Sequence, residues 1–304
     1  MFLVLLRILD PRWGLNRARR RTAAALRDGQ STAPPRGWAL SGTLVVAAVA
    51  LASGVAQGAD WPDSRKLDPI VYRADFKLDA LAFDFQEITA LGRELRRTLG
   101  IPAPREPVEV YLFGTQAAYA RHLRSVLGQA PDRRAMYVKA AGRGRVYVYV
   151  SDELATDLRH ECTHALLHAA LRDAPLWLDE GLAEYFEVPA DQRAFDNPHL
   201  GALLRSNIAW EYAPPLAELE SRRDLGELTP DDYRHAWAWV HFMFHGPQAG
   251  HEELVEYLAE LDHRGSPGLL GPRLRGRIPD LERQFLLHFK RWERKSAPST
   301  SDTD

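Results

Sequence analysis

Two histidines four residues apart, His160 and His164, bound the pentapeptide "HECTH", and Glu161 stands beside the first of them. The surrounding residues, 152–171, have apolar side chains at helical spacing, and residues i and i+4 lie on one face of a helix. Both imidazoles can therefore reach one ion, and Glu161 can reach a water molecule beside it. The spacing predicts two zinc ligands and a general base.

A third protein ligand has to come from elsewhere, and an acidic stretch, "PLWLDEGLAEYFE" at 175–187, follows closely. Fifteen residues separate His164 from Glu180, and nineteen separate it from Glu184. Either gap lets the chain end one helix, turn, and return on a second. Glu180 and Glu184 share a helix face, so the one that is not a ligand could hold a ligand histidine by its other ring nitrogen. Asp179 is expected to point elsewhere, as a surface or hinge residue.

Together the two stretches resemble the gluzincin zinc metallopeptidases. "WLDEGLAEYF" is similar to the glutamate-donating segment of aminopeptidase N relatives, and residues 70–250 resemble bacterial peptidase MA-like domains, with distant similarity to thermolysin. The resemblance implies one Zn²⁺ per chain on His160, His164 and Glu180, and the thermolysin-like spacing keeps Glu184 as the alternative ligand. It also implies that Tyr233 stabilises charge on the substrate carbonyl oxygen, with His235 as the runner-up.

Other chemically active side chains receive plainer interpretations. His168 continues the i+4 series beyond the pentapeptide and is expected to be a core or surface histidine rather than a ligand. His241 and His245 are also four apart but have no neighbouring glutamate, which favours an exposed helix face. Cys162 is the only cysteine, which excludes an intramolecular disulfide and a thiolate-rich metal site and favours a small buried thiol.

These residues must be positioned by a sheet followed by helices. Strands are expected at 107–114 and as a hairpin over 135–150. Helices are expected at 78–100, 115–128, 152–171, 178–187, 198–206, 230–246, 251–262 and 278–294. Strands before helices indicate an α+β, zincin-like fold with a small mixed or antiparallel sheet and a mainly helical second half. One domain is expected over 60–294, with a polar tail at 295–304.

The N-terminal end has the features of a targeting segment. Residues 1–36 are basic and irregular, and 37–59 are apolar and end in small residues, which is typical of a signal peptide or an apolar membrane anchor. Residues 1–59 hold eight arginines and two aspartates, a net charge of +6, so the remaining 31 basic and 39 acidic residues give −8. We therefore expect export of 60–304, to the periplasm or anchored in the inner membrane facing out of the cytoplasm.

The expected activity is hydrolysis of a peptide bond by a zinc-activated water, with Glu161 as general base. The substrate is a peptide or protein, which could add as a strand to 145–150 if that strand lies at an edge; it could equally be an interior strand, since both of its faces are apolar or aromatic. The sequence shows no "GAMEN"-type motif for a free amino terminus, so endopeptidase or specialised processing activity is favoured. The alternatives are a catalytically silent envelope module for binding or assembly, or a zinc hydrolase of a non-peptide amide. A net charge of −2 gives no support to a nucleic-acid partner.

Overall fold

The computed structural model describes residues 5–6, 61–130, 132–140, 142–171, 174–264 and 267–292 of the 304-residue chain. Apart from the two residues at 5–6, the segments expected as a basic N-terminal region and a targeting segment lie outside the described residues, and so does the polar tail. Over the described ranges, no helix is long and apolar enough to cross a membrane.

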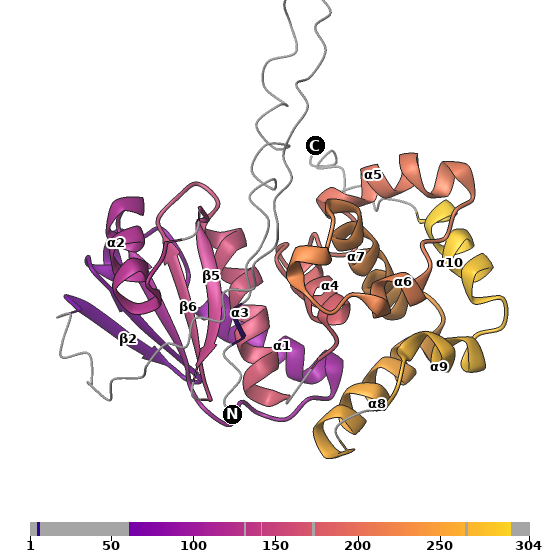
Figure 1. Ribbon diagram of the computed structural model, residues 1–304, viewed down its shortest axis with the longest axis horizontal. Helices are drawn as coiled ribbons and strands as arrows, with labels where there is room; N and C mark the ends of the chain where they lie inside the picture. Colours follow the sequence, from indigo (N-terminus) through magenta and orange to yellow (C-terminus); the bar gives the residue numbers. More distant parts are fainter. Residues whose placement is uncertain are drawn as a thin grey trace, which may run out of the picture.

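A mixed β-sheet forms the first half of the molecule (Figure 1). Its strands are β1 (Leu5–Leu6), β2 (Asp63–Leu67), β3 (Ile70–Ala74), β4 (Val108–Phe113), β5 (Ala135–Ala140) and β6 (Arg143–Tyr149). In space their order is β1-β5-β6-β4-β3-β2; β3–β4 and β4–β6 pair in parallel, and the other pairs are antiparallel. The predicted strand at 107–114 and the hairpin at 135–150 are confirmed. The hairpin of β2 and β3 was not predicted.

Strand β6 lies in the interior of this sheet, not at its edge. It pairs with β4 on one side and with β5 on the other along most of its length. The backbone donors and acceptors of 145–150 are therefore largely used within the sheet, and a peptide cannot add there as a further strand. The expectation of substrate pairing at 145–150 is wrong for this reason. The strand nearer the edge is β5; over the described residues, β1 pairs with it opposite Val138 and Lys139.

Alternation along the strands divides the apolar side chains between the two faces of the sheet. The helices that cover these faces are α1 (Gln86–Leu99), α2 (Gln116–Leu127) and α3 (Leu154–Ala170). Val110 and Val146 join the main core with residues of α1 and α3, whereas Phe113 and Tyr147 form a smaller cluster with residues of α2. The sheet therefore lies between α2 and the pair α1 and α3, as Figure 1 shows.

The second half is helical, as expected. Its α-helices are α4 (Leu176–Phe186), α5 (Pro198–Ser206), α6 (Leu216–Ser221), α7 (Pro230–His245), α8 (Gln248–Arg264), α9 (Leu270–Arg277) and α10 (Leu281–Lys290). The start of α7 is encoded locally: Thr229 caps it in a reciprocal capping box with Asp232, and Pro230 occupies the first turn. The helix expected at 278–294 begins instead at 281, after Asp280 adopts a left-handed conformation (φ 51°). The predicted sheet followed by a mainly helical half is confirmed.

Candidate metal centre

Helices α3 and α4 bring the predicted site together at the junction of the two halves. Helix α3 packs against β5 and β6, and α4 packs between α3 and α7. The approach of α4 to α7 requires a glycine, because a Cβ on Gly181 would lie 2.6 Å from the backbone oxygen of Ala236. Gly181 follows Glu180 directly. The close packing of α4 against α7 therefore fixes the position of the Glu180 carboxylate along α3.

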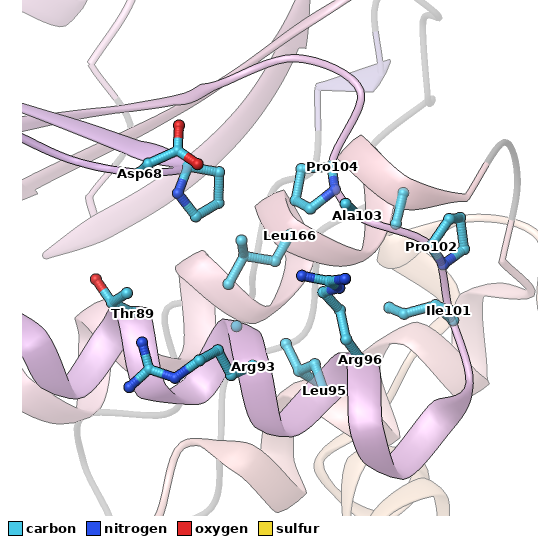
Figure 2. Close-up of a pocket in the computed structure, with 13 residues that line it drawn as sticks. Asp68, Thr89, Arg93, Leu95, Arg96, Ile101, Pro102, Ala103, Pro104 and Leu166 are labelled. Carbon is cyan, nitrogen blue, oxygen red and sulfur yellow. The ribbon is translucent and has the colours of Figure 1, made fainter.

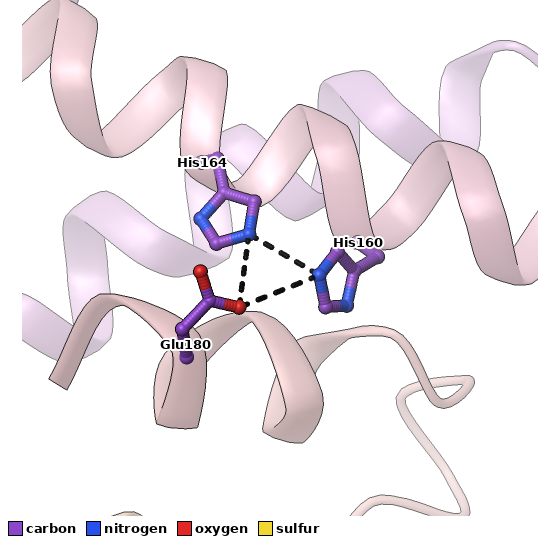
Figure 3. Close-up of side chains that lie close together, drawn as sticks. All are labelled: His160, His164 and Glu180. Atoms are coloured by element: carbon purple, nitrogen blue, oxygen red, sulfur yellow. Dashed lines mark hydrogen bonds and ion pairs between the residues drawn. The ribbon is translucent and has the colours of Figure 1, made fainter. Parts of the chain in front are cut away.

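Three ligand atoms converge between these helices (Figure 3). His160 Nε2 and His164 Nε2 are 3.2 Å apart, and Glu180 Oε2 lies 3.9 Å and 3.6 Å from them, respectively. Zinc bonds of 2.0–2.2 Å in tetrahedral geometry separate two ligand atoms by about 3.3–3.6 Å. The triangle therefore has nearly the size that one zinc ion needs, with its fourth position left for a small molecule.

Each candidate ligand histidine is held by a carboxylate at its other ring nitrogen. His160 Nδ1 lies 3.1 Å from Glu187 Oε2, and His164 Nδ1 lies 2.8 Å from Asp179 Oδ2. Such bonds fix the tautomer that leaves Nε2 free to bind a metal. The interpretation of Asp179 as a surface or hinge residue is wrong, since its side chain is fully buried; its other oxygen lies 3.2 Å from His168 Nε2.

Glu184 has a different partner from the one expected. Its Oε2 lies 2.8 Å from Nε2 of His199, a residue of α5. It also groups with His160 and Glu187, one helical turn beyond Glu180, but it does not join both histidines of the pentapeptide in any candidate group found over the described chain. The structure thus brings Glu180, and not the alternative Glu184, to the two histidines.

The centre carries a large excess of buried negative charge. Glu161, Asp179, Glu180, Glu184 and Glu187 are all at most 4% exposed. Burial by itself lowers the pKa of the neighbouring His160, but the hydrogen bond with Glu187 and the surrounding carboxylates outweigh burial and raise this pKa to about 10. A positive charge at this position is therefore strongly favoured, as expected for a cation-binding centre.

Glu161 has the electrostatics of a general base that works near neutral pH. It is 4% exposed. Burial raises its pKa to about 7, against a downward effect of His160 and with a further upward contribution from Glu180. A carboxyl group with such a pKa can both take up and release a proton near pH 7.

The candidate oxygen-stabilising residues occupy the first turns of α7. Tyr233 is 2% exposed, and its phenol, like Glu161, acts electrostatically on the guanidinium of Arg133. His235 lies 3.1 Å, through its Nε2, from the side-chain nitrogen of Asn207. The choice of Tyr233 over His235 for a role at the centre stays a prediction.

Several residues of the centre escaped the sequence analysis. Glu187 continues the series of Glu180 and Glu184 at i+7, so helical periodicity alone could have included it. His168, which was expected to be a core or surface histidine, lies in the core: it is 6% exposed and packs edge-on against Tyr137. For Arg133, which precedes β5, no sequence signal stands out, since its place depends on tertiary packing.

A separate pocket of about 280 Å³ lies on the other side of α3 (Figure 2). It is lined by α1, the β2–β3 turn and the segment 101–104, and α3 contributes Leu166 and Ala170. None of the candidate ligands lines it. This hollow is therefore distinct from the place where the reactive side chains meet.

Comparison with known proteins gives likeness at the level of structure only. Neither a protein-family model nor a curated protein matches the chain. Among solved structures, it is similar to an M1 zinc metallopeptidase from Deinococcus radiodurans, with 18% identity and a TM-score of 0.44 over 75% of this chain and 48% of that one. A mutant of that enzyme bound to a Tyr-Ser-Ala substrate gives 18% identity and a TM-score of 0.42 over 78% and 51%. The chain spans about half the length of these structures, so its function has to be argued from its own site.

Proposed function

We propose that this protein is a zinc-dependent peptidase. The observation that supports this most directly is the buried triangle of His160, His164 and Glu180 with Glu161 beside it. Two imidazoles and one carboxylate, with no thiolate, are a donor set of catalytic zinc rather than of closed structural zinc, which takes four protein ligands. When bound there, zinc would polarise the substrate carbonyl and lower the pKa of a water molecule to about 7.

The protein side chains supply the proton transfers. Glu161 takes a proton from the attacking water and delivers it to the nitrogen of the leaving amine. Its pKa near 7 suits both steps, because neither protonation state is strongly disfavoured. Tyr233 donates a hydrogen bond to the carbonyl oxygen as negative charge develops there. Asp179 and Glu187 keep the two imidazoles oriented throughout.

The substrate is proposed to be an extended peptide lying beside α3. Since most of β6 is paired on both sides, the part of β5 that precedes Val138 is the strand along which such a peptide would pair. We also propose that residues 37–59 direct export, so that the domain works in the periplasm or at the outer face of the inner membrane. Protease accessibility in intact spheroplasts tests this, because a cytoplasmic domain would stay protected.

A single substitution tests the activity. The zinc-loaded protein and its Glu161→Gln variant are incubated with a mixed peptide library, and products are identified by mass spectrometry. We expect cleavage by the native protein and a loss of about 10²–10⁴-fold in the variant, with zinc content unchanged, because only the proton acceptor is removed.

Glu252→Gln, at an exposed position of α8, is the matched control and should cleave like the native protein. Equal cleavage by native protein and Glu161→Gln would contradict the assigned base. A folded, zinc-loaded protein that cleaves no peptide would favour the silent binding module.

A further inference from the structure

Arg133 carries a guanidinium group whose two terminal nitrogens are buried. Its Nη1 and Nη2 are inaccessible to solvent, and neither has a hydrogen-bond partner within the described part of the chain. A guanidinium cannot give up its proton, and leaving its donors buried and unmatched is costly. Glu161, Tyr233, Tyr119 and Glu180 all act on it electrostatically.

Its neighbour fixes this position. Arg134 forms a two-pronged bond to Asp157, with Nε and Nη2 lying 2.9 Å and 3.0 Å from the two carboxylate oxygens. Asp157 stands one helical turn before Glu161 on the same face of α3. The chain leading into β5 is thereby anchored to the turn that presents the general base, and Arg133 is held next to it.

Two other arginines at the junction of the two halves have guanidinium groups that are bonded within the protein. Arg159 bonds to the backbone oxygen of Glu187 and lies 2.7 Å from Glu87 Oε1. Arg193 donates to the backbone oxygen of Val188 at 2.8 Å and pairs with a glutamate of α1. Arg133 as a whole is less buried than these two arginines, but its Nη1 and Nη2 are buried and have no hydrogen-bond partner in the described part of the chain, so a ligand could satisfy them.

A second donor accompanies it. The Tyr119 hydroxyl, from α2, is buried and has no hydrogen-bond partner among the residues the structure covers. It interacts electrostatically with both Arg133 and Glu161. A planar guanidinium fork matches a carboxylate in a two-pronged geometry, and a hydroxyl can add a further bond to the same group.

We infer that Arg133, assisted by Tyr119, recognises a carboxylate of the substrate: either the C-terminal carboxylate or an aspartate or glutamate side chain next to the scissile bond. This inference deepens the proposed function and rests on it. The specificity it predicts is for acidic groups close to the cleavage point, and Arg133 acts by binding them rather than by transferring protons.

Binding is measured by calorimetry on the zinc-loaded Glu161→Gln protein, so that no turnover interferes. The probes are N-acetyl-Ala-Leu-Ala and its C-terminal amide, and N-acetyl-Ala-Asp-Leu-Ala amide and its asparagine counterpart. We expect at least one acidic peptide to bind about 10-fold to 100-fold more tightly than its neutral partner. The pair that shows the difference identifies the source of the carboxylate.

Arg133→Gln in the same background should abolish the difference in affinity between the acidic peptide and its neutral partner, and Arg133→Lys should keep part of it. The control Arg124→Gln, at an exposed position of α2, should leave the difference unchanged. Thermal unfolding separates binding from structure: Arg133→Gln should keep its Tm because no protein bond is lost, whereas Arg134→Gln should lower it. No preference for acidic peptides, a preference that survives Arg133→Gln, or a Tm loss matching Arg134→Gln would overturn the inference.

The two proposals fail separately. Cleavage by the native protein without an Arg133-dependent preference would leave the peptidase standing and remove the carboxylate site. Arg133-dependent binding of acidic peptides without cleavage by the native protein would leave the carboxylate site standing and remove the peptidase.

Discussion

Two pairs of histidines in this chain share a spacing but differ in the side chains around them. His160 and His164 on α3 are four residues apart, and so are His241 and His245 on α7. The first pair lies among buried carboxylates, which raise the pKa of His160 to about 10. The second pair lies among rings and takes no carboxylate partner in any described contact.

In the second group, which we call the α7–α10 histidine cluster (His241, His245 and His288), burial holds the imidazoles neutral. It lowers the pKa of His245 and of His288 to about 4. His241 donates through Nε2 to the Ala194 oxygen at 3.0 Å, so its Nδ1 accepts from His288 Nε2 at 3.0 Å. The bonding capacity of His241 is thus used inside the protein.

In this chain, i, i+4 histidines form a candidate metal centre where carboxylates lie opposite them, and their spacing alone does not create one. A cation is favoured where Asp179, Glu180 and Glu187 converge, and disfavoured where aromatic rings and other histidines line the space. The expectation that His241 and His245 lie on an exposed helix face is wrong, because His241 is fully buried and His245 is only partly accessible.

The largest expected effect is on metal content. His164→Gln should reduce bound zinc from near one per chain to almost none, because a site with three protein ligands loses one of them. His245→Gln is the matched control, with the same substitution at the same helical spacing, and should retain the metal. Both are measured by mass spectrometry of metals on purified protein. Zinc lost equally from both variants, or retained in both, would break the distinction between the two groups.

A smaller effect is expected from the carboxylate behind the ligand. Asp179→Asn keeps the shape of the side chain but removes the charge that orients and polarises His164, so zinc affinity should fall about 10-fold to 100-fold. Competition with a chromophoric chelator measures it. Glu184→Gln, whose partner is His199, should change affinity much less. A larger loss in Glu184→Gln than in Asp179→Asn would show that the groups supporting the metal are misassigned.

The sequence was sufficient for what is encoded locally. Helix boundaries at Thr115 and Thr229 follow from caps that the structure forms, and the order of strands and helices indicated the fold class. Helical spacing was enough to name His160 and His164, whereas it left Glu180 and Glu184 both open, and Glu180 was preferred from the resemblance to the gluzincins.

What the sequence could not supply depends on contacts between distant elements. Asp179 was misjudged because its partners on α3 are reached only once α4 has docked. Arg133 was not singled out, because its place depends on the Arg134–Asp157 bond. The interior position of β6 followed from the parallel β4–β6 pairing, which no local pattern encodes. His241 was misplaced for the same reason: α10 buries it.

The smallest expected effect concerns acid stability and acts through the α7–α10 histidine cluster. An unfolded histidine titrates near pH 6.5, whereas folded His288 titrates near pH 4, so between these values the unfolded chain binds the additional proton. The contribution of neutral His288 to the free energy of unfolding is fully present above pH 6.5 and is lost as the pH falls toward 4. His288→Gln keeps a hydrogen-bond donor and should reduce the slope of the free energy of unfolding against pH. One proton sets an upper limit of about 1.4 kcal/mol per pH unit, and the effect should be smaller because the imidazole is partly exposed.

The native protein and His288→Gln are unfolded in urea at pH 7.5, 6.0 and 5.0, and the difference between their free energies of unfolding is measured at each pH. Contributions of the distant metal centre are the same in both proteins and cancel in this difference. The difference should shrink steadily as the pH falls, because only the native protein loses the contribution of a neutral His288. A difference that is independent of pH would mean that His288 titrates alike in both states, and the contrast between the two histidine groups would then rest on metal binding alone.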